Sequence, residues 1–584
     1  MAKFDYAPAP ESRAIVTIRP SYGLFIGGEF VQSTDGSRFK TITPSSEEVL
    51  AEVTEAGQAD VDAAVRAARK AFEGPWGRLP GAERGKYLFR IARILAERAR
   101  EFAVLETLDN GKPIKESRDV DVPLAAAHFF YHAGWADKLE YAGLLGGGGQ
   151  GPKPLGVVGQ VIPWNFPLLM LSWKIAPALA TGNTVVLKPA ETTPLTALLF
   201  AEVCQQADLP AGVVNIITGA GQTGRHLIEH PGVDTVAFTG STQAGKEIAR
   251  SIAGTRKRAT LELGGKAANI VFDDAAIDEA VEGIVNGIFF NQGHVCCAGS
   301  RLLVQENVAD DVVMRLKRRM QTLRVGDPLD KNTDIGAINS AVQLARIREL
   351  TQVGESEGAT RWSAPCALPD RGFWFPPTVF TEVSQSHRIA QEEIFGPVLS
   401  VLTFRTPQEA VAKANNTPYG LSAGIWTEKG SRILWMADQL RAGVVWANTF
   451  NRFDPASPFG GYKESGYGRE GGRHGLQAYV TTGATRCAPR HVDVAGPNPM
   501  VARINASRCA RPTSSTSAGR SHAASPAAPT KCVPPAQPAG FWPTPRWAPA
   551  RTRGTLSWLP GVPSGNGPGQ APTTVVRCCT GWLS

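Results

Sequence analysis

The apolar run GVVGQVI (156–162) opens a series of short runs in the middle of this 584-residue chain, followed by TVVL (184–187), VVNII (213–217), TVAFT (235–239) and ATLEL (259–263). Each run has the length and composition of a buried strand. Helical patterns lie between them, over 194–207, 223–229 and 242–253. Strands that alternate with helices predict a parallel sheet covered by helices on both faces.

Further helical and strand-like patterns lie on both sides of this region. A second α/β segment extends from about residue 269 to 458, with helical patterns over 277–288, 309–323 and 409–415 and a strand-like run over 398–404. On the N-terminal side, helical spacing predicts helices over 59–72, 82–108 and 122–139. Four consecutive glycines at 146–149 are typical of a connector. The fold class is therefore predicted to be α/β.

The composition is that of an ordinary globular protein, with 43% apolar and 20% charged residues. The net charge of +8 is unevenly placed. Residues 488–584 hold ten basic residues and a single acid, so the net charge of residues 1–487 is −1. A neutral body favours neither nucleic acid nor a membrane surface as a partner.

The segment 488–584 differs from the rest of the chain in composition. It contains sixteen of the 43 prolines, is rich in Ala, Ser, Gly and Arg, and has no sustained periodicity. Such a low-complexity basic segment is predicted to be disordered. An out-of-frame extension of the gene is one hypothesis for its origin, and a basic arm that touches nucleic acid is the functional alternative.

The N-terminus lacks a basic start followed by an apolar core, so no signal peptide is predicted. The most apolar stretch, 157–187, is interrupted by prolines, asparagines and a lysine, and it is not expected to span a membrane. Only five of the nine cysteines precede residue 488, which does not make a disulfide framework. We therefore expect a soluble cytoplasmic protein without a metal centre.

Three short motifs carry groups that could act on a carbonyl carbon. Cys296 and Cys297 lie in GHVCCAG (293–299), Glu262 lies on an apolar strand before two glycines, and Asn165 lies between two prolines. Each has a structural alternative: buried small side chains, a lysine ion pair and turn chemistry, respectively. Together, a thiol, a carboxylate and an amide donor are the set required for acyl chemistry.

Two glycine-containing segments are candidates for a dinucleotide site. GAGQTG (219–224) has the glycine spacing of a dinucleotide fold, but no acid stands about 20 residues further on, so the signal is weak. FTGSTQAG (238–245) ends a strand and starts a helix at Ser241, which is a suitable place for a phosphate. An ordinary helix cap at Ser241 is the alternative interpretation.

Over about residues 20–485 the chain resembles the aldehyde dehydrogenase superfamily, specifically its NAD-dependent, non-acylating members. The resemblance rests on motifs in the family's order: PWNFP (163–167), LKPAE (187–191), FTGST (238–242), LELGGK (261–266), GHVCCAGSR (293–301), EEIFGPV (392–398) and PFGGYKESGYGRE (458–470). It implies a Rossmann-like parallel-sheet NAD-binding domain, an α/β catalytic domain and a homodimer or homotetramer.

The resemblance also implies the bounds of the domains. They are 20–142 and 152–262 for the NAD-binding domain, 263–462 for the catalytic domain, and 463–487 for a return to the cofactor and oligomerisation region. The glycine-rich segment 143–151 would be a shortened connector where the family has oligomerisation strands. Residues 488–584 form the basic tail.

The resemblance assigns roles to individual residues. Cys296 would be the nucleophile, Asn165 and the Cys296 amide would hold the oxyanion, and Glu262 would activate the hydrolytic water. The remaining matched positions are Lys174 and Glu470 for a proton path; Trp164, Lys188, Glu191, Gly221, Gly240, Ser241, Gly245, Glu393 and Phe395 for the cofactor; and Phe166, Met170, Trp173, Phe290 and Phe459 for the substrate tunnel.

These roles imply oxidation of an aldehyde to a carboxylic acid through a thiohemiacetal and a thioester. The acid at 191 favours NAD over NADP, and the apolar tunnel favours aliphatic or aromatic aldehydes. His294 replaces the family's usual Gln, and its ring could tune the thiol or pack. One alternative is a catalytically silent NAD-binding scaffold of the same fold. The other is a CoA-acylating dehydrogenase, and the presence of Glu262 counts against it.

Overall fold

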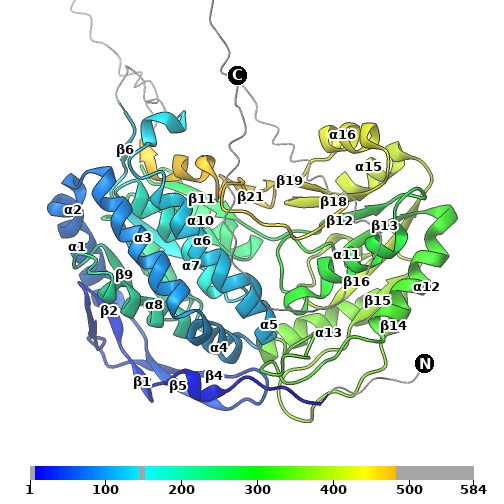
Figure 1. The fold of residues 1–584 in the computed structure, drawn as a ribbon, viewed down its shortest axis with the longest axis horizontal. Coiled ribbons are helices and arrows are strands. Elements are labelled where there is room, and N and C mark those ends of the chain that lie inside the picture. Colours follow the sequence, from blue (N-terminus) through cyan, green and yellow to red (C-terminus); the bar gives the residue numbers. More distant parts are fainter. Residues whose placement is uncertain (1–6, 144–150, 482–584) are drawn as a thin grey trace, which may run out of the picture. The chain divides into compact units, whose positions relative to one another are not determined.

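The computed structural model describes residues 7–143 and 151–481, and all of these belong to one compact unit. Two large sheets, each with helices around it, form the framework of this unit (Figure 1). The α/β class is therefore confirmed. Residues 144–150 of the predicted connector 143–151, and the tail 488–584, lie outside the described residues.

The first sheet has eight strands in the order β21-β11-β10-β7-β8-β9-β2-β3. Its central strands β11, β10, β7, β8 and β9 are parallel, as the alternation of runs and helices predicts. The bounds are Leu24–Ile26 for β2, Glu29–Val31 for β3, Val157–Val161 for β7, Thr184–Lys188 for β8, Val214–Ile216 for β9, Thr235–Thr239 for β10, Arg258–Glu262 for β11 and Gly466–Tyr467 for β21.

Successive side chains of these strands face opposite sides of the sheet, so each side has its own core. Val158, Val185 and Ala237 pack in one cluster, and Val157, Val186 and Val236 pack in another. The first cluster contains α3 (Gly81–Glu97), α4 (Ala99–Asn110), α6 (Val122–Ala133), α7 (Pro167–Ala180) and α8 (Leu195–Gln206), and the second contains α1 (Gln58–Glu73), α9 (Gly221–Glu229) and α10 (Thr242–Ile252). Helices therefore cover both faces.

The second sheet has seven strands in the order β14-β15-β16-β13-β12-β18-β19, and only β14 is antiparallel to its neighbour. The bounds are Ala268–Val271 for β12, Arg301–Gln305 for β13, Thr360–Ser363 for β14, Thr378–Thr381 for β15, Val398–Phe404 for β16, Ser422–Trp426 for β18 and Val444–Ala447 for β19. Its main helices are α11 (Ile277–Phe289), α12 (Ala309–Met320), α13 (Ala341–Ser356), α15 (Pro407–Asn415) and α16 (Gly430–Gln439).

Short elements join and flank the two sheets. The strands β1 (Ser21–Tyr22), β4 (Arg38–Ile42) and β5 (Val49–Thr54) form a separate sheet, and β6 (Lys153–Pro154) pairs with β22 (Val480–Thr481). The strands β17 (Tyr419–Gly420) and β20 (Tyr462–Lys463) pair, and the short helices are α2 (Pro75–Arg78), α5 (Ile114–Glu116) and α14 (Arg388–Gln391).

Three helices differ from the sequence prediction. The helix predicted over 82–108 is two helices, α3 and α4, because Arg98 adopts a non-helical backbone with φ −95° and ψ 14°. The helix predicted over 122–139 ends at Ala133, before Gly134. Helix α7 was not predicted, and it lies between β7 and β8 with all of its residues buried.

Candidate active site

A pocket with a volume of about 520 Å³ lies at the carboxyl ends of β10 and β11, which is where open parallel sheets bind ligands. Most of the residues predicted for a site line it. They are Trp164, Asn165, Phe166, Met170, Trp173, Lys188, Glu191, Gly240, Ser241, Glu262, Phe290, Cys296, Glu393, Phe395, Phe459 and Glu470. The pocket therefore gathers segments that are far apart in the sequence.

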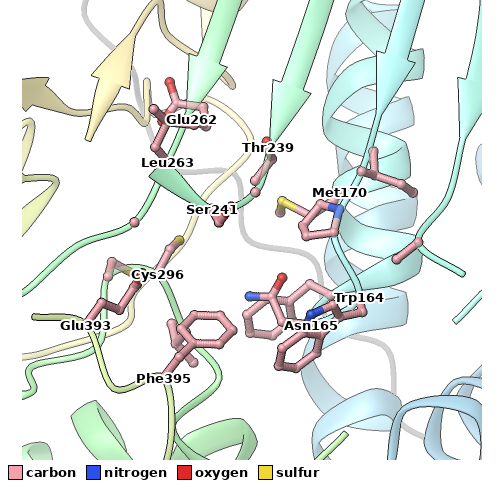
Figure 2. A pocket seen from close by; sticks show the side chains of 18 of the residues that line it. Trp164, Asn165, Met170, Thr239, Ser241, Glu262, Leu263, Cys296, Glu393 and Phe395 are labelled. Carbon is pink, nitrogen blue, oxygen red and sulfur yellow. The ribbon is translucent and has the colours of Figure 1, made fainter. Parts of the chain in front are cut away.

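Cys296 reaches the pocket from a tight turn after α11. Asn291 and Gln292 have φ values of 47° and 53°, and Gly293 has a φ of 76°. A Cβ on Gly293 would stand 2.1 Å from the carbonyl oxygen of Gly396, so only glycine fits there. The turn directs Cys296 toward the space that Asn165 also faces (Figure 2).

Asn165 is tied to the same turn by its side chain and its main chain. Its Nδ2 donates to the carbonyl oxygen of His294 at 2.8 Å, and Nδ2 of Asn291 donates to the carbonyl oxygen of Asn165 at 2.7 Å. A side-chain amide carries two N–H groups, so the bond to His294 leaves one for a ligand in the pocket. The arrangement can hold a negatively charged oxygen.

Glu262 is the last residue of β11, between β10 and β21. It is buried, and neither of its carboxylate oxygens has a hydrogen-bond partner among the described residues. Burial, and next the negative charge of Glu470, raise the pKa of Glu262 well above its usual range. A carboxyl group with a raised pKa suits a general base near neutral pH.

Lys174 and Glu470 form a buried ion pair beside Glu262. Glu470 lines the pocket, whereas Lys174 lies on α7 behind it. Among the described residues, no lysine forms a hydrogen bond with Glu262. The lysine ion pair that was the structural alternative for Glu262 is formed by Glu470 and Lys174 instead.

The thiol of Cys296 is held in its neutral form. The side chain of Cys297, and next burial, raise the pKa of the Cys296 thiol well above its ordinary value. Cys296 is half-buried, and Cys297 is buried. The thiol must therefore lose its proton before it can act as a nucleophile.

His294 packs between aromatic rings. Its ring stands edge-on to Trp164 with centroids 4.8 Å apart, and stacks on Phe395 at 5.8 Å. Burial, and next the charge of Lys112, lower the pKa of His294 to about 3, so the ring is neutral near pH 7.

The other end of the pocket carries groups that suit a dinucleotide. Ser241 is the N-cap of α10, and its Oγ accepts from the main-chain N–H of Ala244 at 3.2 Å. Ser241 therefore caps the helix and also lines the pocket. Lys188 is buried with its Nζ 3.6 Å from Oε2 of Glu191. The hydroxyl of Thr239 lines the pocket without a partner among the described residues. A helix N-terminus fits a diphosphate, and carboxylates fit ribose hydroxyls.

Glu393 supplies a second carboxylate at this end. Its Oε1 accepts from the main-chain N–H of Gly265 at 3.1 Å, and burial raises its pKa to about 7. A Cβ on Gly264 would stand 2.3 Å from Oε2 of Glu393, so the two glycines let the carboxylate approach the main chain.

Gly221 and Gly245 are not among the residues that line the pocket. Gly221 starts α9, and a Cβ there would meet no atom within 4 Å. A Cβ on Gly245 would stand 2.4 Å from the side chain of Leu263, so Gly245 allows α10 to pack against the end of β11. The glycine spacing at 219–224 thus marks a strand-to-helix turn outside the pocket lining.

Several lining residues were absent from the sequence prediction. They include Val120, Leu169, Thr239, Gln343, Tyr419 and Phe453. Val120 and Phe453 lie in stretches without a motif, and only the spatial arrangement brings them to the pocket. Leu169 lies on α7 one residue before Met170, and Thr239 lies within the motif at 238–242, so those two could have been found from their neighbours.

No helix in 7–143 or 151–481 is long and apolar enough to cross a membrane. No group of three His, Cys, Asp or Glu side chains in those ranges is placed to hold a metal ion.

Comparisons with known proteins identify the family. Residues 30–484 match the model of the aldehyde dehydrogenase family. The chain is 46% identical over 470 residues to an aldehyde dehydrogenase of Alternaria alternata, covering 79% of this chain and 94% of the relative. It is 45% identical over 464 residues to a mitochondrial benzaldehyde dehydrogenase of Antirrhinum majus, covering 78% and 87%.

A solved structure of aldehyde dehydrogenase from Bacillus cereus, a complex with NAD⁺, superposes with a TM-score of 0.78 at 42% identity, over 81% of this chain and 98% of that one. The fold and the pocket define the class of protein as an α/β dehydrogenase. The chain belongs to the aldehyde dehydrogenase family, and the family resemblance drawn from its motifs is confirmed.

Proposed function

We propose that this enzyme oxidises an apolar aldehyde to a carboxylic acid with NAD as the oxidant, and that the reaction passes through covalent intermediates on Cys296. The observation that carries the proposal is the convergence of the Cys296 thiol, the Asn165 amide and the Glu262 carboxyl on one pocket. Asn165 lies far from Glu262 and Cys296 in the sequence, and each of the three residues supplies one element of acyl chemistry.

The first step is addition of sulfur to the aldehyde. Cys296, which is half-buried, loses its proton to solvent, and the thiolate forms a bond to the carbonyl carbon. The π electrons of the C=O bond move to the oxygen, where the free N–H of Asn165 and the main-chain N–H of Cys296 stabilise the charge. Loss of one such donor costs about 10²–10³ in rate in comparable sites.

The second step is release of the acid. When bound, NAD supplies the acceptor for the hydride that leaves the substrate carbon, which turns the adduct into a thioester. Glu262 then removes a proton from water, and the resulting hydroxide adds to the thioester carbon. The C–S bond breaks, the acid leaves, and Lys174 with Glu470 carries the proton from Glu262 outward.

The cofactor end of the pocket supports NAD rather than NADP. Lys188 and Glu191 would hold the adenosine ribose, Trp164, Gly240 and Ser241 the diphosphate, and Glu393 with Phe395 the nicotinamide ribose and ring. Gly221 and Gly245 would contribute to cofactor binding indirectly, Gly221 through the turn before α9 and Gly245 through the packing of α10 against the end of β11. The side chain of Glu191 is 52% exposed at the pocket, and its charge would repel a 2′-phosphate.

These roles divide the chain into functional parts. We assign NAD binding to 20–142 and 152–262 and catalysis to 263–462. We assign 463–487 to the cofactor and oligomerisation region, and the pairing of β21 with β11 in its described part supports this assignment. Assembly as a homodimer or homotetramer and a cytoplasmic location complete the proposal.

The substrate end is apolar and aromatic. Phe166 stacks on Phe290 with centroids 6.0 Å apart, and Trp173 meets Phe459 at 5.3 Å. The basic residues of the lining, Lys188 and Arg346, are not part of this aromatic group. The Lys112 ammonium stands 4.5 Å from the centroid of the Phe166 ring, but it is paired with Glu106 and Asp121 and does not line the pocket. An aromatic wall with no cation in its lining favours aliphatic or aromatic aldehydes over charged semialdehydes.

A panel of aldehydes assayed with NAD and with NADP tests the substrate and cofactor together. We expect benzaldehyde and medium-chain aliphatic aldehydes to have kcat/KM values at least about tenfold above that of a semialdehyde with a free carboxylate, because the carboxylate would be desolvated without a partner. Equal values for the charged and uncharged aldehydes would contradict the assignment. A protein that binds NAD but oxidises none of the panel would instead be the silent scaffold.

A further inference from the structure

A cluster of buried charged residues lies outside the pocket lining, around Lys112. The Lys112 side chain is fully buried, and its Nζ lies 2.6 Å from Oδ2 of Asp121 and 3.1 Å from Oε1 of Glu106. Glu116 is a third buried carboxyl group of the same region. We call these four residues the Lys112 cluster. Burying so many ionisable groups is costly, so the cluster requires an explanation.

The Lys112 cluster bonds to both segments that build the reaction centre. Oε2 of Glu116 accepts from the main-chain N–H of Asn291 at 2.9 Å, on the turn that leads to Cys296. Oε2 of Glu106 accepts from the main-chain N–H of Leu168 at 3.2 Å, three residues after Asn165. The Lys112 ammonium also stands 4.5 Å from the ring centroid of Phe166.

Asn291 carries the connection onward to the oxyanion amide. Its main-chain N–H is held by Glu116, and its Nδ2 donates to the carbonyl oxygen of Asn165 at 2.7 Å. Asn165 in turn donates to the carbonyl oxygen of His294, two residues before Cys296. A continuous chain of hydrogen bonds thus extends from Glu116 through Asn291 and Asn165 to His294, two residues before Cys296.

The turn at Asn291 needs external support. Asn291 and Gln292 are successive non-glycine residues with positive φ, a conformation that costs free energy unless the surroundings hold it. The hydrogen bond from the Asn291 N–H to Glu116 ties the turn to a distant part of the chain, and this bond can hold the positive φ values in place.

We propose that Glu116, supported by the Lys112 cluster, is a positioning residue that holds Asn291 and thereby sets Cys296 and Asn165 at their working separation. The inference rests on the proposed roles of Cys296 and Asn165. It assigns no contact with substrate to Glu116.

The protonation of Glu116 suggests which substitution preserves its role. Burial, and next the charge of Asp121, raise the pKa of Glu116 to about 8, so the group is largely a neutral acid at pH 7. The amide of glutamine has the same size and also presents a carbonyl oxygen as an acceptor. Glu116→Gln should therefore keep the bond to Asn291, and Glu116→Ala should remove it.

Asp109 provides a matched control on a neighbouring element. Asp109 is buried on α4, its Oδ2 accepts from the main-chain N–H of Leu195 at 2.9 Å, and its Oδ1 accepts from the hydroxyl of Thr41 at 2.8 Å. Burial raises its pKa to about 7. Like Glu116, it is a buried carboxyl group that holds a main-chain N–H, but its bonds do not reach the turn before Cys296.

The experiment compares Glu116→Ala, Glu116→Gln and Asp109→Ala in the full-length enzyme. The burst of NADH in the first turnover gives the number of folded active sites from its amplitude and the chemical rate from its rate constant. Alkylation by iodoacetamide, located by peptide mass spectrometry, measures the reactivity of Cys296 without NAD or aldehyde.

We expect Glu116→Ala to lower the burst rate constant per site by at least about tenfold, because small displacements of reacting groups have large effects on rate. The alkylation rate of Cys296 should change in the same variant, while the KM for NAD stays the same. Glu116→Gln should remain within about threefold of the wild type in burst rate constant. Asp109→Ala should lose stability but keep its burst rate constant.

The inference is overturned if Glu116→Ala reacts at the wild-type rate per site, if Glu116→Gln is as slow as Glu116→Ala, or if Asp109→Ala slows chemistry equally. A wild-type enzyme that forms no NADH from any aldehyde of the panel, or one that is alkylated at Cys297 and not at Cys296, would instead contradict the proposed function. The two failures are thus distinguishable.

Discussion

Replacing Cys296 with alanine should reduce NADH formation by at least about 10⁴-fold, since the thiol that forms the covalent adduct is lost and the neighbouring Cys297 thiol is buried. The matched variant Cys297→Ala should remain active. Both cysteines line the pocket, but Cys297 is buried with its Sγ 3.9 Å from Oδ1 of Asn451, whereas Cys296 is half-buried. Single-turnover assays at saturating NAD and benzaldehyde measure the difference.

The two variants also separate the effects of the paired thiols on one another. The Cys297 side chain is the largest cause of the raised pKa of Cys296. Cys297→Ala should therefore lower the pKa of Cys296 and increase its rate of alkylation by iodoacetamide at neutral pH. In the wild type, the alkylation rate should keep rising with pH beyond the ordinary thiol range. Activity in Cys296→Ala together with its loss in Cys297→Ala would show that Cys297, and not Cys296, is the nucleophile.

The sequence predicted the central strands well because they are short, apolar and separated by polar turns. It did not predict α7, because every residue of Pro167–Ala180 is buried and the segment has no polar face to give a helical period. It predicted α3 and α4 as one helix, because neither Pro nor Gly marks the break at Arg98.

The site was predictable only where a motif marked it. Cys296, Glu262 and Asn165 stand in motifs, and all three line the pocket. The glycines at 219–224 had dinucleotide spacing but lie outside the pocket lining, because glycine spacing alone cannot distinguish a phosphate loop from an ordinary turn. The partners of Lys112 were not predictable, since its ion pairs with Glu106 and Asp121 depend on how the connection between α4 and α5 packs against the helical residues on either side.

Replacing Glu262 with glutamine should separate the two halves of the reaction. A glutamine cannot take a proton from water, so hydrolysis of the thioester should slow by about 10²–10⁴-fold. The first turnover does not require this base, so a burst of NADH should persist with an amplitude close to the number of active sites. Stopped-flow absorbance of NADH measures both phases. Normal steady-state turnover in Glu262→Gln would mean that another group is the base.

The pH dependence of turnover supplies an independent test of the same base. Glu262 acts when ionised, and its pKa is raised first by burial and then by Glu470, so hydrolysis in the wild type should increase with pH through a midpoint well above that of an ordinary glutamate. Glu470→Gln removes that negative charge and leaves Lys174 as an uncompensated positive charge nearby. Both changes favour the ionised form of Glu262. The midpoint for turnover should therefore move to lower pH in Glu470→Gln, whatever the variant does to the maximal rate. A midpoint that stays fixed or rises would show that the titrating base does not lie beside Glu470.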